Sequence, residues 1–421
     1  MAGHLAVLGG EPLRKAPFPK WPVFGREEEE ALLKVLRSGH WALPEDGEIE
    51  RFEKRFAEYH GAKFGIAAVN GTIALRIALL AAGLQAGDEV IVPPYTFLAT
   101  ATSVIEANGT PIFVDIEADT FNIDPKAIEP AVTPRTRAVI PVHLGGLPCD
   151  LDAIMALARR RGLTVIEDAC HAHGSEHQGR RVGAIGHLGC FSFQSSKNLN
   201  CGEGGIILTN DQGLADACRS IHNCGRVPGG AWYEHHTISG NYRLTQFQAA
   251  ILNGQLDRLD GQTVTRDRNG RYLAERLRQV PGIHPQVRGR GETRHAYHLF
   301  PFRYDASIYG VPRSIFLKAL TAEGIPGSPG YTLPLYRQPV FANKEFGPYT
   351  GYRQVRPDLD YRRICCPVCE LICAGEGCWI YQSVLLGTQS DMNDVVKAFE
   401  KIHDHRDELV KVPLREAKAA E

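Results

Sequence analysis

Little in this sequence would hold the chain to a polyanion or a lipid surface. Its 421 residues include 47 Lys and Arg against 48 Asp and Glu, a formal net charge of −1, so we expect neither nucleic acid nor a membrane as a partner. No apolar run reaches the roughly 18 residues of a membrane span, and the apolar stretch at the N-terminus is too short for a secretory signal. A cytoplasmic protein is therefore expected.

The cysteines also lack the spacing of a complete metal site. The 11 cysteines are odd in number, which argues against a disulfide framework. Cys366 and Cys369 show the C-x2-C spacing of zinc or iron–sulfur ligands, but no second pair follows. The sequence predicts no metal and indicates packing as small apolar side chains for the C-terminal cluster of Cys365, Cys366, Cys369, Cys373 and Cys378.

What the sequence does contain is a regular alternation. Between residues 65 and 209, short apolar stretches rich in β-branched residues alternate with helical patterns of about ten residues. This predicts βαβ units and an α/β fold with a mostly parallel sheet between two helical layers. In such sheets, functional residues collect at the carboxyl ends of the strands.

The pattern changes in the C-terminal part. A helix is predicted from Leu244 to Leu259 and a second from Asp267 to Val280, followed by short strands mixed with helices, which indicates a smaller α+β domain. We therefore divide the chain into an extended arm (1–25), a large domain (26–265), a small domain (266–410) and a tail (411–421).

Three segments place polar residues where chemistry is expected. FSFQSSKNLNCGEGG (191–205) holds Lys197, VIEDACHAHG (165–174) delivers Asp168, His171 and His173 after an apolar strand, and AAVNGTIAL (67–75) turns from a strand into a helix whose free N–H groups can bind an anion. Each segment alone has an ordinary explanation as a solvated lysine, a helix cap or a turn.

Together the three segments fit one cofactor. Pyridoxal phosphate (PLP) needs a lysine for its Schiff base and a carboxylate for its pyridine nitrogen. Its phosphate needs a cradle such as a helix N-terminus. The combination predicts a PLP enzyme.

Longer motifs then identify a resemblance. EVIVPPYTFLATA (89–101), FVDIEADTFNIDP (113–125), AVIPVHLGGLPCDLDAI (138–154) and GNYRLTQFQAAIL (240–252), with the segments above, resemble the DegT/DnrJ/StrS-like sugar aminotransferases, which are fold type I PLP-dependent transferases. The resemblance runs from about Pro17 to His403. It implies a three-layer PLP-binding domain and a smaller C-terminal domain.

The resemblance also implies roles near the cofactor ring. Lys197 would form the Schiff base and shuttle the proton, Asp168 would pair with the pyridine nitrogen, and His171 would lie beside the phenolic oxygen. Phe97 would stack on the ring, although it could instead be an ordinary core residue. Gln194 is counted with the cofactor-binding residues.

Further roles concern the phosphate. The backbone of Gly71 and Thr72, with the hydroxyls of Thr72 and Ser192, would hold it. Asn241 would reach the phosphate of a neighbouring subunit, which implies a homodimer with shared active sites. Asn241 could instead cap the helix that begins near Leu244, and Ser192 could simply be small.

The resemblance implies a two-step reaction in one site, through pyridoxamine phosphate. L-glutamine or L-glutamate would give the amino group, and a keto-cyclitol or keto-sugar would take it. Gln194, three residues before the lysine, is similar to the residue that scyllo-inosose aminotransferases and aminohydroxybenzoate synthases carry there, which favours a free polyol ketone over a nucleotide-linked one. Tyr381-Gln382 departs from the His pair that those relatives often carry. The loop 228–239 and the stretch around Tyr331 are expected to shape the acceptor pocket.

Three alternatives remain at this point. The chain could aminate nucleotide-linked keto-sugars, or act as an aminohydroxybenzoate-type synthase or dehydratase; Lys197 argues against the dehydratase form, in which histidine replaces the lysine. A non-enzymatic regulator would need a DNA-binding extension or a basic patch, and the near-neutral charge argues against it.

Overall fold

The computed structural model describes residues 4–42, 47–349 and 356–413. A seven-stranded sheet with the order β1-β9-β8-β5-β4-β2-β3 forms its centre. The pairs from β8 to β3 are parallel, and β9 runs antiparallel to both of its neighbours. The strands are β1 (Phe64–Ala68), β2 (Glu89–Val92), β3 (Thr110–Phe113), β4 (Thr136–Val139), β5 (Thr164–Asp168), β8 (Leu188–Ser192) and β9 (Gly205–Thr209).

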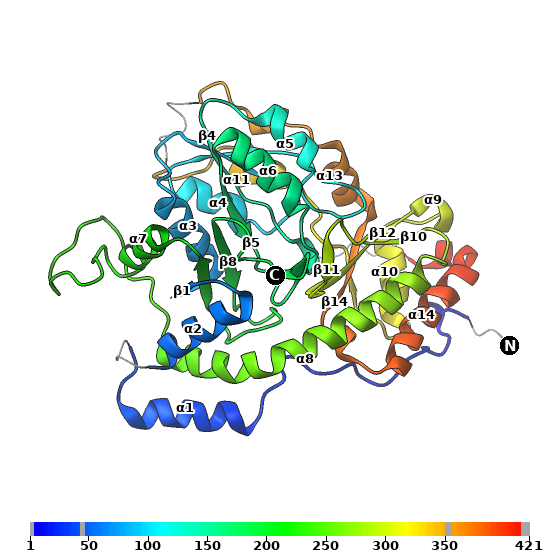
Figure 1. Cartoon of the computed structure of the whole chain (residues 1–421). Coiled ribbons are helices and arrows are strands. Elements are labelled where there is room, and N and C mark those ends of the chain that lie inside the picture. Colours follow the sequence, from blue (N-terminus) through cyan, green and yellow to red (C-terminus); the bar gives the residue numbers. More distant parts are fainter. Residues whose placement is uncertain (1–3, 43–46, 350–355, 414–421) are drawn as a thin grey trace.

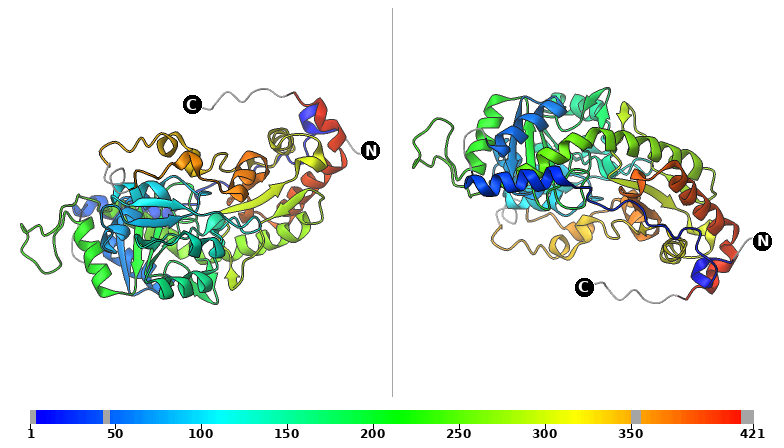
Figure 2. Two further views of the ribbon diagram at one scale, coloured as in Figure 1. Left: turned by 90° about the horizontal axis from the view of Figure 1, so that it is seen from above. Right: turned by 90° about the horizontal axis from the view of Figure 1, so that it is seen from below.

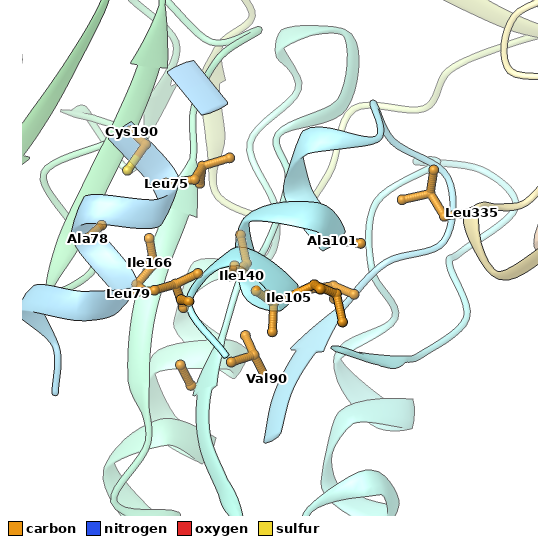
Figure 3. Close-up of a cluster of buried hydrophobic side chains, with 14 of the residues drawn as sticks. Leu75, Ala78, Leu79, Val90, Ala101, Ile105, Ile140, Ile166, Cys190 and Leu335 are labelled. Carbon is orange, nitrogen blue, oxygen red and sulfur yellow. The ribbon is translucent and has the colours of Figure 1, made fainter. Parts of the chain in front are cut away.

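Helices cover both faces of this sheet (Figure 1). In β2, Val90 and Val92 belong to the core cluster under one helical layer, whereas Ile91 belongs to the core on the opposite face, as the two-residue period of a strand requires. Figure 3 shows the first of these cores, in which side chains of α3 and α4 meet those of the sheet. The layers are formed by α3 (Gly71–Ala81), α4 (Ala99–Glu106) and α7 (Gln212–His222) on one face, and by α2 (Glu48–His60), α5 (Pro125–Ala131), α6 (Leu151–Arg161) and part of α8 (Gln246–Leu277) on the other.

The predicted α/β class and the three-layer arrangement are confirmed. The predicted break between two helices is wrong, because α8 is one helix from Gln246 to Leu277. The residues at the expected break are poor helix formers, but Thr263 is buried and donates to the Leu259 carbonyl, and Thr265 donates to that of Gly261. The boundary placed at 265/266 falls inside this helix, and the division into two domains stays a prediction.

A second sheet lies at the far end of α8 (Figure 2). It is antiparallel, with the order β10-β12-β14-β13, and packs with α10 and α14 around its own apolar core. Its elements are β10 (Ile283–Pro285), β12 (Leu299–Tyr304), α10 (Arg313–Ala322), β13 (Gly327–Ser328), β14 (Gly377–Tyr381) and α14 (Gln389–Asp404). The remaining main elements are α1 (Arg26–Ser38), β6 (Glu176–His177), β7 (Arg180–Arg181), β11 (Glu292–Arg294), α9 (Ala306–Tyr309), α11 (Pro339–Ala342) and α13 (Pro367–Leu371).

The cysteine cluster lies around α13 and β14. Cys366, Cys369, Cys373 and Cys378 are buried, and burial raises the pKa of the Cys366 thiol to about 12. In the described residues, no group of three or more His, Cys, Asp or Glu side chains is arranged to hold a metal ion. Within the same residues, no helix has the length and apolar character needed to cross a membrane.

Candidate active site

The predicted site residues, except Asn241, line one cavity of about 780 Å³. The cavity lies at the carboxyl ends of β5 and β8 and at the N-terminus of α3, where a mostly parallel sheet is expected to collect functional groups. Its size is within the range of small-molecule sites.

Asp168 is the last residue of β5, and two donors orient its carboxylate. Thr100 Oγ1 donates to Oδ2 at 2.8 Å, and the Cys170 amide donates to Oδ1 at 3.2 Å. The Thr100 hydroxyl also lies 3.0 Å from that of Thr96. Since Thr100 uses its proton on Asp168, Thr96 must donate to Thr100. Asp168 is 5% exposed, so these two hydrogen bonds fix the position of its carboxyl group inside the protein.

Lys197 stands in the turn after β8, where its amide donates to the Gln194 carbonyl at 2.9 Å. Burial lowers the pKa of Lys197, while Cys170 and Asp168 oppose the shift. The lowered pKa makes the neutral amine, which is the form that acts as nucleophile and base, more accessible near neutral pH.

His171 is neutral and has a defined tautomer. Its Nδ1 accepts from the Gly145 amide at 3.3 Å, which leaves the ring proton on Nε2. Burial, together with the charge of Lys197, lowers the pKa of His171 well below its usual value. By contrast, His173 is turned into the core, where its Nε2 lies 3.0 Å from the Ser192 carbonyl oxygen, and it has no place in the cavity lining.

The N-terminus of α3 forms the other end of the cavity. Asn70 caps the helix by accepting from the Ile73 amide at 2.9 Å, and the amides of Gly71 and Thr72 have no hydrogen-bond partner within the described residues. A Cβ at Gly71 would stand 2.8 Å from that of Ser192. Only glycine therefore lets the helix start approach β8 this closely.

Gln194 and Phe97 complete the wall. The Gln194 Oε1 accepts from the amide and hydroxyl of Ser196 at 2.9 and 2.7 Å, so this side chain holds together the turn that carries Lys197. Phe97 is 61% exposed and lines the cavity. It is not a core residue, and an exposed aromatic face is suited to stacking on a flat ligand.

Asn241 lies outside the cavity of its own chain. It is exposed and pairs with Asn223 in an isolated antiparallel bridge. The alternative in which Asn241 caps a helix is wrong, because Thr245 caps α8 through a capping box with Gln248. The loop 228–239 contributes no residue to the lining of this cavity, whereas Tyr331 does.

Trp21, Thr100 and His298 also line the cavity and were not predicted from the sequence. Trp21 belongs to the N-terminal arm and donates from Nε1 to the Ser195 carbonyl at 3.2 Å. His298 precedes β12, and its ring centroid lies 4.4 Å from that of His171. The spacing of Thr96 and Thr100 after a strand was a usable signal for Thr100. Nothing local marks Trp21 or His298, because both reach the site through long-range folding.

The cavity fits PLP by several independent features of this structure. A lysine and an oriented carboxylate share it, free amides mark one end, and an exposed phenylalanine ring faces it. The missing Cβ of Gly71 lets the start of α3, whose free amides can bind a phosphate, lie against β8.

Known proteins resemble the chain along most of its length. The model of the DegT/DnrJ/EryC1/StrS aminotransferase family matches residues 22–370. An L-glutamine:2-deoxy-scyllo-inosose aminotransferase of Streptoalloteichus tenebrarius is 39% identical over 426 aligned residues, covering 97% of this chain and 100% of the relative.

Solved structures agree with these sequence matches. 3-Amino-5-hydroxybenzoic acid synthase superimposes with a TM-score of 0.82 at 32% identity, covering 93% of this chain and 99% of the other. NtdA from Bacillus subtilis, solved with the bound cofactor PMP, has a TM-score of 0.78 at 26% identity, with coverage of 93% and 86%.

Proposed function

Because the chain belongs to the DegT/DnrJ/EryC1/StrS aminotransferase family and is a PLP-dependent aminotransferase, we propose that it transfers the amino group of L-glutamine to a keto-cyclitol of the scyllo-inosose type. One observation carries this proposal: the end-to-end match at 39% identity with a relative named for this reaction. The cavity supports it, since a small uncharged polyol ketone would fit in about 780 Å³ beside a cofactor.

Lys197 and Asp168 have different roles in the proposed reaction. Bound in this cavity, PLP supplies an electron-accepting ring that lets the α-proton of an amino acid leave and return at a neighbouring carbon. Lys197 removes the α-proton of the donor and returns it, and its lowered pKa favours the neutral amine for this role. Asp168, held by Thr100 and the Cys170 amide, keeps a proton on the pyridine nitrogen.

The other lining residues bind and orient. The amides of Gly71 and Thr72 with the hydroxyls of Thr72 and Ser192 hold the phosphate at the start of α3. Phe97 covers a face of the ring. His171, with its proton on Nε2, donates to an oxygen of the cofactor and stays neutral because of its lowered pKa.

The acceptor is tested by a half-reaction. The enzyme is converted to its amino form with L-glutamine, freed of the donor, and mixed with 2-deoxy-scyllo-inosose, a nucleotide-linked keto-sugar or no acceptor. We expect the absorbance of the lysine-bound form to return quickly only in the mixture that contains the cyclitol, with an amino-cyclitol as product. Recovery with only the nucleotide sugar would contradict the proposed acceptor.

We further propose that the enzyme is a cytoplasmic homodimer in which Asn241 completes the partner's site. Eleven free thiols fit a reducing compartment. The loop that follows α7 extends away from the body of the molecule (Figures 1 and 2). It exposes Trp232 and Tyr233 at 77% each and Ile238 fully. Such an apolar arm is expected to pack on another copy of the chain.

Subunit mixing tests this arrangement. We expect Lys197→Ala and Asn241→Ala homodimers each to be weakly active, whereas an equimolar, re-equilibrated mixture regains about a quarter of the wild-type sites, because half of the dimers carry one intact site. A mixture no more active than its components would show that Asn241 acts within its own subunit or not at all.

A further inference from the structure

A buried arginine without a counter-ion lies behind the cavity. Arg266, in the middle of α8, is 0% exposed, and no carboxylate of the described residues pairs with it. Its Nη1 is buried without a hydrogen-bond partner in the same part of the chain. Burial lowers the pKa of Arg266 to about 9, so the guanidinium is still a cation at neutral pH. The Trp21 ring, whose centroid lies 5.0 Å from the guanidinium carbon, makes a cation–π contact with it but brings no negative charge, and a buried charge without a counter-ion is costly.

Arg266 fixes the orientation of Gln382. Its Nε and Nη2 donate to the same oxygen, Oε1 of Gln382, at 2.9 and 2.6 Å. Both arginine atoms are donors, so the amide can accept them only through its oxygen. The Nε2 group must therefore point away from Arg266. It has no hydrogen-bond partner in the described part of the chain, and Gln382 lines the cavity.

The position of Gln382 has a second support. Asn269, one turn further along α8, donates from Nδ2 to the carbonyls of Leu385 and Gly387 at 2.8 Å each. The segment after β14 is thus attached to α8 independently of the Arg266 contact. A change at Gln382 can alter the cavity while this attachment remains.

We propose that Gln382, polarised and held by Arg266, binds the α-carboxylate of the amino donor. The inference rests on the proposed aminotransferase function and names the part of the same cavity that recognises the donor. No arginine is among the side chains that line the cavity in the described residues, and its lysine, Lys197, stands at the reaction centre. Among the described residues of its own chain, Arg266 is therefore the remaining source of positive potential beside the cavity, transmitted through one amide.

A carboxylate fits this group better than a hydroxyl does. Two N–H bonds of an amide can donate to carboxylate oxygens, and an anion held there offsets the charge of Arg266 at short range in a weakly polar interior. A cyclitol hydroxyl could accept the same hydrogen bond but would leave the guanidinium uncompensated. Arg266 acts here as a positioning residue, because it reaches the substrate only through Gln382.

The test is a thermodynamic cycle in which the Gln382 side chain and the donor carboxylate are each removed, singly and together. Dissociation constants of L-glutamine and of L-glutaminamide, in which an amide replaces the α-carboxylate, are measured for wild type and Gln382→Leu by absorbance titration and by thermal shift. We expect Gln382→Leu to weaken L-glutamine roughly 10–100-fold, the scale of a charge-assisted hydrogen bond, with little change in the limiting rate. L-Glutaminamide should bind both proteins alike.

Gln382→Glu separates recognition from folding. Its carboxylate still accepts both bonds from Arg266 and supplies the missing counter-ion, so a purely structural role predicts normal donor binding, whereas we expect L-glutamine binding to fall although Tm is not lowered. Gln389→Glu, the same exchange at an exposed position of α14, is the matched control. Equal losses for both donors, or normal L-glutamine binding by Gln382→Glu, would overturn the inference. If the wild-type protein binds L-glutamine through its carboxylate but does not transfer the amino group, the proposed function is refuted while the role of Gln382 stands.

Discussion

At the scale of single residues, the site depends on side chains whose polar atoms have only one orientation available. Asp168 is held by a hydroxyl and an amide, and His171 by an amide that fixes its tautomer. A catalytic group that is already oriented needs no reorganisation during the reaction.

The first prediction concerns the negative charge of Asp168. Asp168→Asn keeps the size of the side chain and an oxygen for Thr100 but removes the negative charge. We expect the donor half-reaction to slow by roughly 10²-fold or more, as when a preorganised polar group is removed, with little loss of stability. Rapid-mixing absorbance with L-glutamine measures the rate, and a rate near wild type would exclude the assigned role.

Thr100 is predicted to matter through Asp168. Thr100→Val preserves the shape but removes the 2.8 Å hydrogen bond to Oδ2, and we expect a loss of about 10-fold in the half-reaction, matching one hydrogen bond to a charged group. Thr102→Val, in the same helix but outside the cavity lining, is the control. Equal effects of the two variants would point to damage of α4 instead.

At the scale of elements, the site requires α3 and β8 to approach closely. The methyl group of Gly71→Ala would collide with Ser192, whose Cβ would be 2.8 Å away. We expect the helix start to move and the affinity for PLP to fall at least about 10-fold, since phosphate binding depends on the position of these amides.

Gly261→Ala is the matched control for that variant. Gly261 lies within α8, and a Cβ there meets no atom within 4 Å, so alanine should leave PLP affinity unchanged and stabilise the helix by up to about 1 kcal/mol. Equilibrium dialysis with PLP and thermal unfolding measure both effects. Wild-type affinity in Gly71→Ala would contradict the proposed phosphate site.

The sequence brought out many of the residues that line the candidate cavity because local pattern and chemistry coincide there. Asp168, Ser192 and Lys197 follow apolar strands, and parallel strands bring their carboxyl ends together. The sequence pattern did not predict the continuity of α8, because Thr263 and Arg266 are held in the helix by packing and by contacts with distant residues. Trp21 and Gln382 enter the cavity for the same long-range reason.

At the scale of the whole molecule, buried neutral histidines make stability depend on pH. Burial lowers the pKa of His60 to about 3, and those of His173 and His295 well below their usual value. Their folded pKa values lie below the unfolded ones, so the unfolded chain binds more protons between these values. Stability is therefore present above about pH 6.5, the unfolded pKa, and is lost on acidification.

Urea unfolding of the PLP-saturated enzyme at pH 7.5 and 5.5 checks this expectation. Each such histidine contributes up to about 1.4 kcal/mol per pH unit below its unfolded pKa, so we expect a clearly lower free energy of unfolding at pH 5.5. His60→Asn should reduce the difference between the two pH values. Equal stability at both would contradict the buried neutral state.

The central claim, that Lys197 carries PLP for transamination, is tested most directly by the absorbance spectrum of the purified protein before and after L-glutamine. The account predicts a visible band from the lysine-bound cofactor, its loss to shorter wavelength with the donor, and no such band in Lys197→Ala as purified. A wild-type protein that shows no band after PLP is supplied, or a Lys197→Ala protein that keeps it, would contradict the account.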